Sequence, residues 1–260
     1  MSSVKTETRG SIRLIRFQNP PRGYLTAEGS GLIMNALKDA AADPAARVIV
    51  FTGTDEVFIR HYDVGEIVQA GEAVAAGAIG PDAFESGPFV ELCRAAAAAP
   101  KPVIAAINGV CMGGGFEFSL ACDLRVASAN VDEIGLPETR VGIFPGGGGT
   151  QRLPRLIGEA AALEFILRGT VVDAREALSI GLVHEIAVHA EKRALEIAEE
   201  LAGRGVEGLA AAKALVRGAG DRPIAEGLKA EQHAFHDVLK ADSAMSAMRD
   251  FLAGDQDITR

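Results

Sequence analysis

The stretch from residue 104 to 123, IAAINGVCMGGGFEFSLACD, constrains this chain more than any other. It is typical of a buried strand that passes through Gly113, Gly114 and Gly115 into an apolar segment of helical length. Glycines let a backbone approach a ligand closely, and a helix that begins there directs unpaired N–H groups at it. The pattern predicts either an anion or oxyanion site or a tight structural turn. It matches neither a G-x-G-x-x-G dinucleotide fingerprint nor a phosphate-binding loop, because the required glycine spacing and a Gly-Lys-Ser/Thr sequence are both missing.

Further strands are predicted on the N-terminal side of the glycines. The segment Ser11–Phe17 ends at Asn-Pro-Pro, and the apolar runs 48–51 and 103–107 are typical of strands covered on both faces. Helices are predicted between these strands, one capped by Thr26 and one with an apolar stripe over 89–96. Strands that alternate with helices indicate an α/β fold up to about residue 190.

Two regions depart from this alternation. Residues 70–87 are rich in Ala and Gly with weak periodicity, which predicts a mobile or loosely helical excursion. The chain after residue 190 has a helix-forming composition punctuated by Gly and Pro, with helices expected over 191–201, 209–216, 224–239 and 244–252. We therefore expect a core over residues 1–190 and a C-terminal helical oligomerisation segment over residues 191–260.

Composition and charge exclude several classes of protein. With 48% hydrophobic and 23% charged residues the chain is not disordered, and its net charge of −9 disfavours nucleic acid as a partner. No apolar run has the length of a membrane span, and the polar start does not resemble a signal peptide, so a cytoplasmic protein with no membrane partner is expected. Cys93, Cys111 and Cys122 lack metal-ligand spacing, which predicts free thiols and no metal site.

Two glutamates are candidates for acid–base chemistry. Glu117 follows the three glycines among apolar neighbours, which predicts a low-dielectric setting and a raised pKa. Glu138 follows Pro137 at the start of a predicted helix. For each one alone, a solvated carboxylate in the first turn of a helix is the alternative. The run from Gly146 to Gly149 is costly to order, so close packing or a bound group is expected there.

Three blocks of the sequence resemble successive blocks of one family. NGVCMGGGFEFSLACD, GLPETRVGIFPGGGGTQRLPRLIG and AREALSIGLVHEI are similar in order and spacing to the enoyl-CoA hydratase/isomerase (crotonase) family. The similarity runs from about Ile12 to Ile186 and continues more weakly through the C-terminal helices. It implies an α/β fold with a crotonase-type ββα spiral core and a C-terminal helical segment, assembled as a homotrimer or a dimer of trimers.

The resemblance also implies an activity, the hydration of trans-2-enoyl-CoA to 3-hydroxyacyl-CoA. Backbone N–H groups of Tyr62 and Gly114 would form an oxyanion hole for the thioester oxygen. Glu117 would act as the base toward water and Glu138 as the acid at C2, because syn addition of water needs both roles. No cofactor is implied beyond the coenzyme A of the acyl-CoA substrate. The residues that the resemblance assigns to substrate or CoA binding are Arg22, His61, Asp63 and Gly113.

The chain departs from the family pattern at one loop. Most members have small residues where this chain has Phe58-Ile59-Arg60-His61-Tyr62-Asp63. The Tyr62 ring is expected to narrow the acyl pocket while its N–H remains a donor, and participation of His61 or the Tyr62 hydroxyl in the chemistry is the alternative. Three other functions therefore stay open: an enoyl-CoA isomerase, an acyl-CoA hydrolase, and a CoA-binding protein without activity. The acyl group and the pathway are not specified by the sequence.

Overall fold

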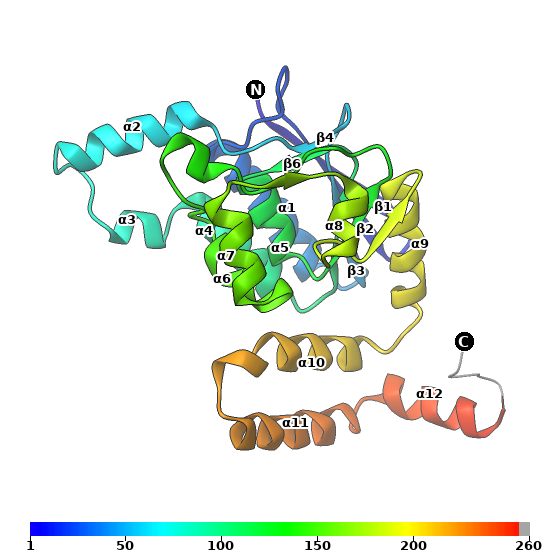
Figure 1. The fold of residues 1–260 in the computed structure, drawn as a ribbon. Helices are drawn as coiled ribbons and strands as arrows, with labels where there is room; N and C mark the ends of the chain where they lie inside the picture. Colours follow the sequence, from blue (N-terminus) through cyan, green and yellow to red (C-terminus); the bar gives the residue numbers. More distant parts are fainter. Residues whose placement is uncertain (255–260) are drawn as a thin grey trace.

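The computed structural model describes residues 1–254 and contains two β-sheets with helices packed around them (Figure 1). The larger sheet has the order β1-β2-β3-β5-β7-β10, in which β1 and β2 form an antiparallel hairpin and all later neighbours are parallel. Its strands are β1 (Ser3–Arg9), β2 (Ile12–Gln18), β3 (Val48–Thr52), β5 (Val103–Ile107), β7 (Leu124–Ser128) and β10 (Glu185–Ala187).

The smaller sheet leads into two of the predicted site residues. Its order is β4-β6-β8-β9, with parallel pairing except between β8 and β9. Its strands are β4 (Val57–Ile59), β6 (Val110–Met112), β8 (Ile134–Gly135) and β9 (Val171–Val172). The short strands β4 and β8 each lead directly into a loop that carries a predicted site residue, Tyr62 or Glu138.

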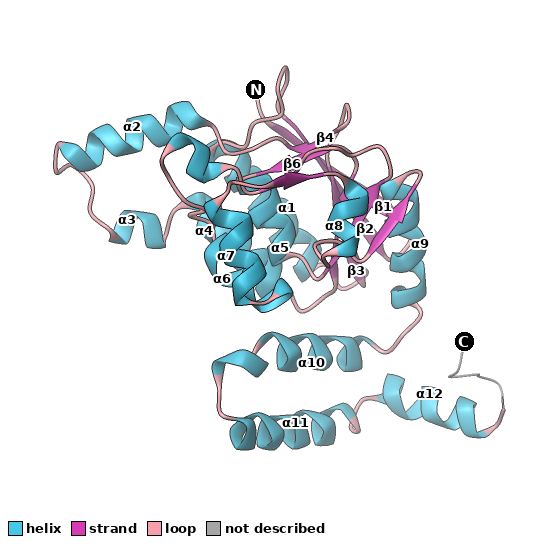
Figure 2. Ribbon diagram, in the orientation of Figure 1, coloured by secondary structure: helices cyan, strands magenta, loops and turns pink. Residues whose placement is uncertain are grey.

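The helices of residues 1–254 cover both sheets and continue beyond them (Figure 2). The α-helices are α1 (Ala27–Ala42), α2 (Val64–Ala75), α3 (Asp82–Glu85), α4 (Pro88–Ala98), α5 (Gly114–Ala121), α6 (Gly149–Ile157), α7 (Glu159–Leu167), α8 (Ala174–Ser179), α9 (Ala190–Ala202), α10 (Val206–Arg217), α11 (Ile224–Val238) and α12 (Asp242–Leu252). Two 3₁₀ helices complete them, η1 (Glu138–Val141) and η2 (Ala219–Asp221).

Burial explains why the parallel strands read as continuous apolar runs. All residues of β3 and β5 are buried, because the sheet is covered on both faces. One face, with Ile49 and Phe51, packs into the main core with α1 and α4; the other face, with Val48 and Val50, packs against α9. Thr26 caps α1 as predicted, since its side chain accepts from the Gly29 N–H at 3.0 Å.

The structure makes two sequence expectations more specific. Residues 70–87 contain the end of α2 and all of α3, which agrees with the helical alternative for this segment; α2 is capped by Asp63, whose side chain accepts from the Glu66 N–H at 3.1 Å. The helix expected over 191–201 is part of the core packing, because Ala194 and Ala198 of α9 are buried against the sheet. The strand β1 was not predicted, since its polar sequence forms a largely exposed edge.

The last three α-helices extend away from the sheets (Figure 1). None of their residues is buried. The helix α10 is fastened to the core by ion pairs from Lys213 and Arg217 to Asp123, at 2.7 and 2.9 Å. Residues 255–260 of the predicted C-terminal segment lie outside the described residues. Within residues 1–254, no helix combines the length and the apolar character needed to cross a membrane.

Candidate active site

The first candidate residue, Glu117, lies in a fully buried helix. Every residue of α5 is buried, and Glu117 itself is only 2% exposed. Its Oε1 atom accepts hydrogen bonds from the N–H groups of Gly147 and Gly149, both at 2.7 Å. Burial raises the pKa of Glu117 from its ordinary 4.5 to about 6, although these N–H groups and the nearby charge of Arg152 favour the ionised form. The low-dielectric setting expected from the sequence is confirmed.

The second candidate, Glu138, begins η1 directly after β8 and Pro137. Its Oε1 atom lies 3.3 Å from the position that a Cβ on Gly113 would occupy. Its Oε2 atom is buried and has no hydrogen-bond partner within the described part of the chain. Burial and the negative charge of Glu117 raise the pKa of Glu138 to about 7. The two carboxyl groups therefore lie close enough for the charge of Glu117 to act on Glu138.

A pair of backbone donors lies at the glycine turn 113–115. A Cβ on Gly114 would lie 3.4 Å from the backbone nitrogen of Tyr62, so the two backbones are close together. Leu25 pairs with the residues on either side of Tyr62, donating to His61 and accepting from Asp63, which turns the Tyr62 N–H away from it. Neither the Tyr62 N–H nor the Gly114 N–H has a hydrogen-bond acceptor within residues 1–254. These N–H groups are free to bind an oxygen atom of a ligand.

The Tyr62 side chain is fixed by its neighbours. Its hydroxyl donates to Oε2 of Glu66 at 2.8 Å, and the same oxygen accepts from the Ala27 N–H at 2.8 Å. The Tyr62 ring lies 5.5 Å from the ring of Phe89, centroid to centroid. The Phe89 ring in turn occupies the space that a Cβ on Gly147 would need. Two aromatic rings thus pack beside the backbone donors and the turn that binds Glu117.

The remaining predicted residues form a series that leads outward to solvent. The side chain of His61 lies 3.3 Å, at its Cβ, from the position of a Cβ on Gly113, and its ring lies 4.5 Å from that of Tyr24. Exposed Arg22 donates to the Tyr24 hydroxyl at 3.2 Å. Asp63 instead caps α2 through the Glu66 N–H. His61, Tyr62 and Glu138 thus lie beside Gly113 and Gly114. The other three predicted residues lie at separate points: Glu117 binds the turn 147–149, Asp63 caps α2 and Arg22 contacts Tyr24.

Sequence reasoning missed several side chains of this site. Phe89 was assigned only to an apolar helix stripe, and neither Glu66 nor Arg152 was singled out. The spacing Asp63-x-x-Glu66 is a helix N-terminal signal that would have predicted the start of α2. The glycine run 146–149 indicated an ordered turn, but its partner, Glu117, lies about 30 residues away in the sequence.

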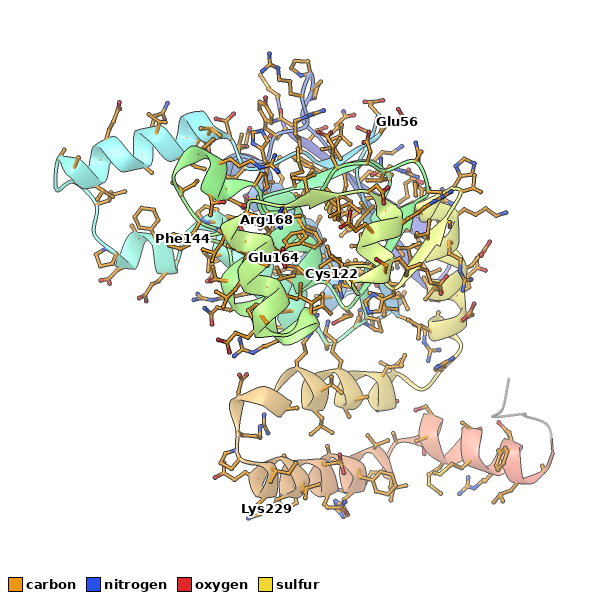
Figure 3. The ribbon with its side chains drawn as sticks, viewed as in Figure 1. Glu56, Cys122, Phe144, Glu164, Arg168 and Lys229 are labelled. Atoms are coloured by element: carbon orange, nitrogen blue, oxygen red, sulfur yellow. The ribbon has the colours of Figure 1, made fainter. Side chains whose placement is uncertain are left out.

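The other reactive side chains lie elsewhere. The three cysteines are free and buried, with Cys122 at the end of α5 (Figure 3), and His233 and His236 are exposed on α11. The loop between Glu138 and the glycine turn carries Phe144, which is 67% exposed (Figure 3). Among residues 1–254, no three His, Cys, Asp or Glu side chains converge as a metal site would require.

The structure is that of an α/β protein with two interacting carboxyl groups of raised pKa. Comparison with known proteins then assigns the family: the model of the enoyl-CoA hydratase/isomerase family matches residues 7–256. The chain belongs to this family, and its fold is the crotonase fold, as the sequence blocks indicated.

Individual relatives agree with this assignment. The chain is 35% identical over 253 residues to a putative enoyl-CoA hydratase/isomerase of Bacillus subtilis (strain 168), covering 96% of this chain and 93% of that protein. It is 40% identical over 196 residues to the peroxisomal bifunctional enzyme of Danio rerio, covering 75% of this chain but only 25% of that longer protein. The crystal structure of enoyl-CoA hydratase from Bacillus anthracis superimposes with a TM-score of 0.87 at 31% identity, covering 96% of each chain.

Proposed function

We propose that this protein hydrates trans-2-enoyl-CoA thioesters to 3-hydroxyacyl-CoA. The observation that carries the proposal is the pair of carboxyl groups, Glu117 and Glu138, whose pKa values are both raised and whose charges interact. Hydration needs a base for the water that attacks C3 and an acid that protonates C2. Two carboxyl groups whose environments differ can divide these roles.

The surroundings of the two glutamates support a division of labour. Glu117, with a pKa of about 6 and two N–H donors on Oε1, is the group more readily ionised and serves as the base. Its other oxygen accepts no hydrogen bond within residues 1–254 and is available for water. Glu138, with a pKa of about 7 and an unpartnered buried oxygen, is the group more readily protonated and serves as the acid.

The N–H groups of Tyr62 and Gly114 complete the proposed chemistry. Addition to C3 places negative charge on the thioester oxygen, which two unpartnered donors can stabilise. One such donor is worth about 3 to 4 kcal/mol of transition-state stabilisation. Because both donors belong to the backbone, the tyrosine in place of the family's small residue leaves this function intact.

Substrate binding is proposed to follow the series of side chains that leads outward. Gly113 and His61 lie beside the carboxyl groups, and exposed Arg22 supplies a positive charge for CoA phosphates. Asp63 contributes indirectly, by capping α2 and fixing the loop that holds Tyr62. No cofactor takes part other than the coenzyme A of the substrate.

A homotrimer, or a dimer of trimers, is proposed as the assembly. The support is the apolar surface of α10–α12, where no residue is buried in the single chain. Exposed apolar surface of this extent marks an interaction site. The large apolar side chains exposed there are Val206, Val216, Ile224, Leu228, Phe235, Leu239, Met248, Phe251 and Leu252.

The test uses crotonyl-CoA with the purified protein. A hydratase removes the absorbance of the conjugated enoyl thioester and releases no free thiol. A hydrolase releases free coenzyme A, an isomerase acts on a 3-enoyl-CoA, and a non-catalytic binding protein retains the thioester unchanged. Release of thiol, or conversion of 3-enoyl-CoA without hydration of crotonyl-CoA, would replace the proposed function with the matching alternative.

A further inference from the structure

The turn that holds Glu117 is itself held from behind by an arginine. Arg152, on α6, donates from Nη1 to the carbonyl oxygen of Gly147 at 2.8 Å, and its own N–H donates to the carbonyl of Gly148 at 2.8 Å. In the same turn, the N–H groups of Gly147 and Gly149 donate to Glu117. The guanidinium and the carboxylate therefore bind the same glycine turn, one at a carbonyl oxygen and the other at N–H groups.

The glycine sequence of the turn permits this arrangement. Gly148 has φ of 110°, a conformation that favours glycine, and a Cβ there would overlap the guanidinium of Arg152. Arg152 is half-buried and forms no ion pair with any carboxylate of residues 1–254. Its charge is thus available to the turn and to Glu117, not neutralised by a partner of its own.

We propose that Arg152 is a positioning residue for the general base. It fixes the carbonyl of Gly147 so that the N–H groups of the turn bind one oxygen of Glu117 and leave the other for water. This inference rests on the proposed function, in which Glu117 is the base. In this role Arg152 acts through its contacts with the turn and through its charge.

The charges around Glu117 make the inference testable by titration. Three titratable groups of the described chain interact electrostatically with the Glu117 carboxylate: Cys93 from α4, Glu138 from η1 and Arg152 from α6. Burial raises the pKa of Cys93, which keeps it neutral, and Glu138 contributes no positive charge in either form. Arg152 is the cation of the set, so its removal is expected to raise the pKa of Glu117.

The experiment compares Arg152→Gln with Arg152→Lys. Glutamine removes the charge, and the acid limb of the pH profile of kcat/KM should move upward by roughly one pH unit, the lower end for an opposite charge nearby. Lysine keeps the charge but lacks the planar fork of the guanidinium, so kcat should fall while the limb stays near its original pH. Arg155→Gln, on the same helix but exposed, is the matched control and should change neither quantity.

A second readout does not depend on turnover. A ¹³C NMR titration of glutamate-labelled protein, with the resonance assigned through Glu117→Gln, follows the carboxyl group directly. An upward shift of the Glu117 pKa in Arg152→Gln, with the value in Arg152→Lys near that of wild type, supports the inference. It does so even if crotonyl-CoA is not hydrated, because that result would refute only the proposed function. Active hydratase whose Glu117 titrates identically in Arg152→Gln and wild type would refute the inference alone. If Arg152→Gln does not fold, Arg152→Lys provides the test. An acid limb of kcat/KM that moves in Arg152→Lys as far as predicted for Arg152→Gln would refute the inference.

Discussion

Replacement of Glu117 by glutamine should abolish activity and at the same time stabilise the protein. The amide oxygen can accept from Gly147 and Gly149 in place of Oε1, so the turn keeps its hydrogen bonds. The neutral amide cannot accept a proton from water, and turnover of crotonyl-CoA should fall by at least ~100-fold, the lower end for general acid–base catalysis. KM should change much less, because the carboxylate acts mainly in the transition state.

The stability change follows from the pKa of the buried carboxyl group. Folding raises it from 4.5 to about 6, and each pKa unit corresponds to about 1.4 kcal/mol. Because the pKa of Glu117 is higher in the folded protein than in the unfolded chain, protonated Glu117 favours folding. This contribution to the free energy of unfolding is complete below pH 4.5 and is lost as the pH rises through about 6. The ionised carboxylate therefore costs about 2 kcal/mol above that range. Glu117→Gln removes this cost, which should raise Tm by about 4 to 8 °C near neutral pH.

The assay pairs the loss of enoyl absorbance with thermal unfolding at acidic and neutral pH. Glu164→Gln, which neutralises an exposed glutamate paired with Arg168 on α7 (Figure 3), is the matched control and should alter neither property appreciably. The difference in Tm between Glu117→Gln and wild type should shrink below pH 4.5. A variant that loses turnover and is also destabilised at neutral pH would refute this reasoning, because Glu117 would then be a structural residue.

Three further predictions test the rest of the site. Glu138→Gln should lower hydration by at least ~100-fold with little change in KM; near-wild-type turnover would exclude a two-glutamate mechanism. The pH profile of kcat/KM should rise through about 6 as Glu117 ionises and fall through about 7 as Glu138 ionises. A profile that stays flat between about pH 5 and about pH 9 would contradict these assignments. Tyr62→Ala should retain hydration and accept bulkier acyl groups, because the ring beside Phe89 is removed and the N–H remains; loss of turnover on every acyl-CoA would give the hydroxyl a catalytic part.

Local pattern was sufficient to predict the parts of the fold that are uniformly buried. The strands β3 and β5 and the helix α5 are buried along their whole length and almost entirely apolar, which leaves an unambiguous pattern. The edge strand β1 and the exposed helix α2 contain no fully buried residue, so no apolar periodicity marked them. The positions of both glutamates were found because each follows a distinctive turn sequence, and the resemblance paired them.

The contacts that tune the site could not be read from the sequence. Tyr62 and Phe89 are separated by 27 positions along the chain, and their packing depends on how α2 and α3 return the backbone to α4. Arg152 lies near the glycine run, yet its contact with Gly147 is informative only because Glu117 binds N–H groups of the same turn. Such relations arise from tertiary packing, which brings separate segments of the chain to one point.

Isotope labelling of the product tests the central claim most directly. Crotonyl-CoA is incubated with the protein in H₂¹⁸O and, separately, in D₂O, and the acyl-CoA product is analysed by mass spectrometry and NMR. Hydration by Glu117 and Glu138 predicts ¹⁸O at C3 and a single deuterium at C2 of an intact 3-hydroxyacyl-CoA, with neither label incorporated by the Glu117→Gln variant. Label found in a free carboxylate together with released coenzyme A, or no label at C3 at all, would contradict the hydratase assignment.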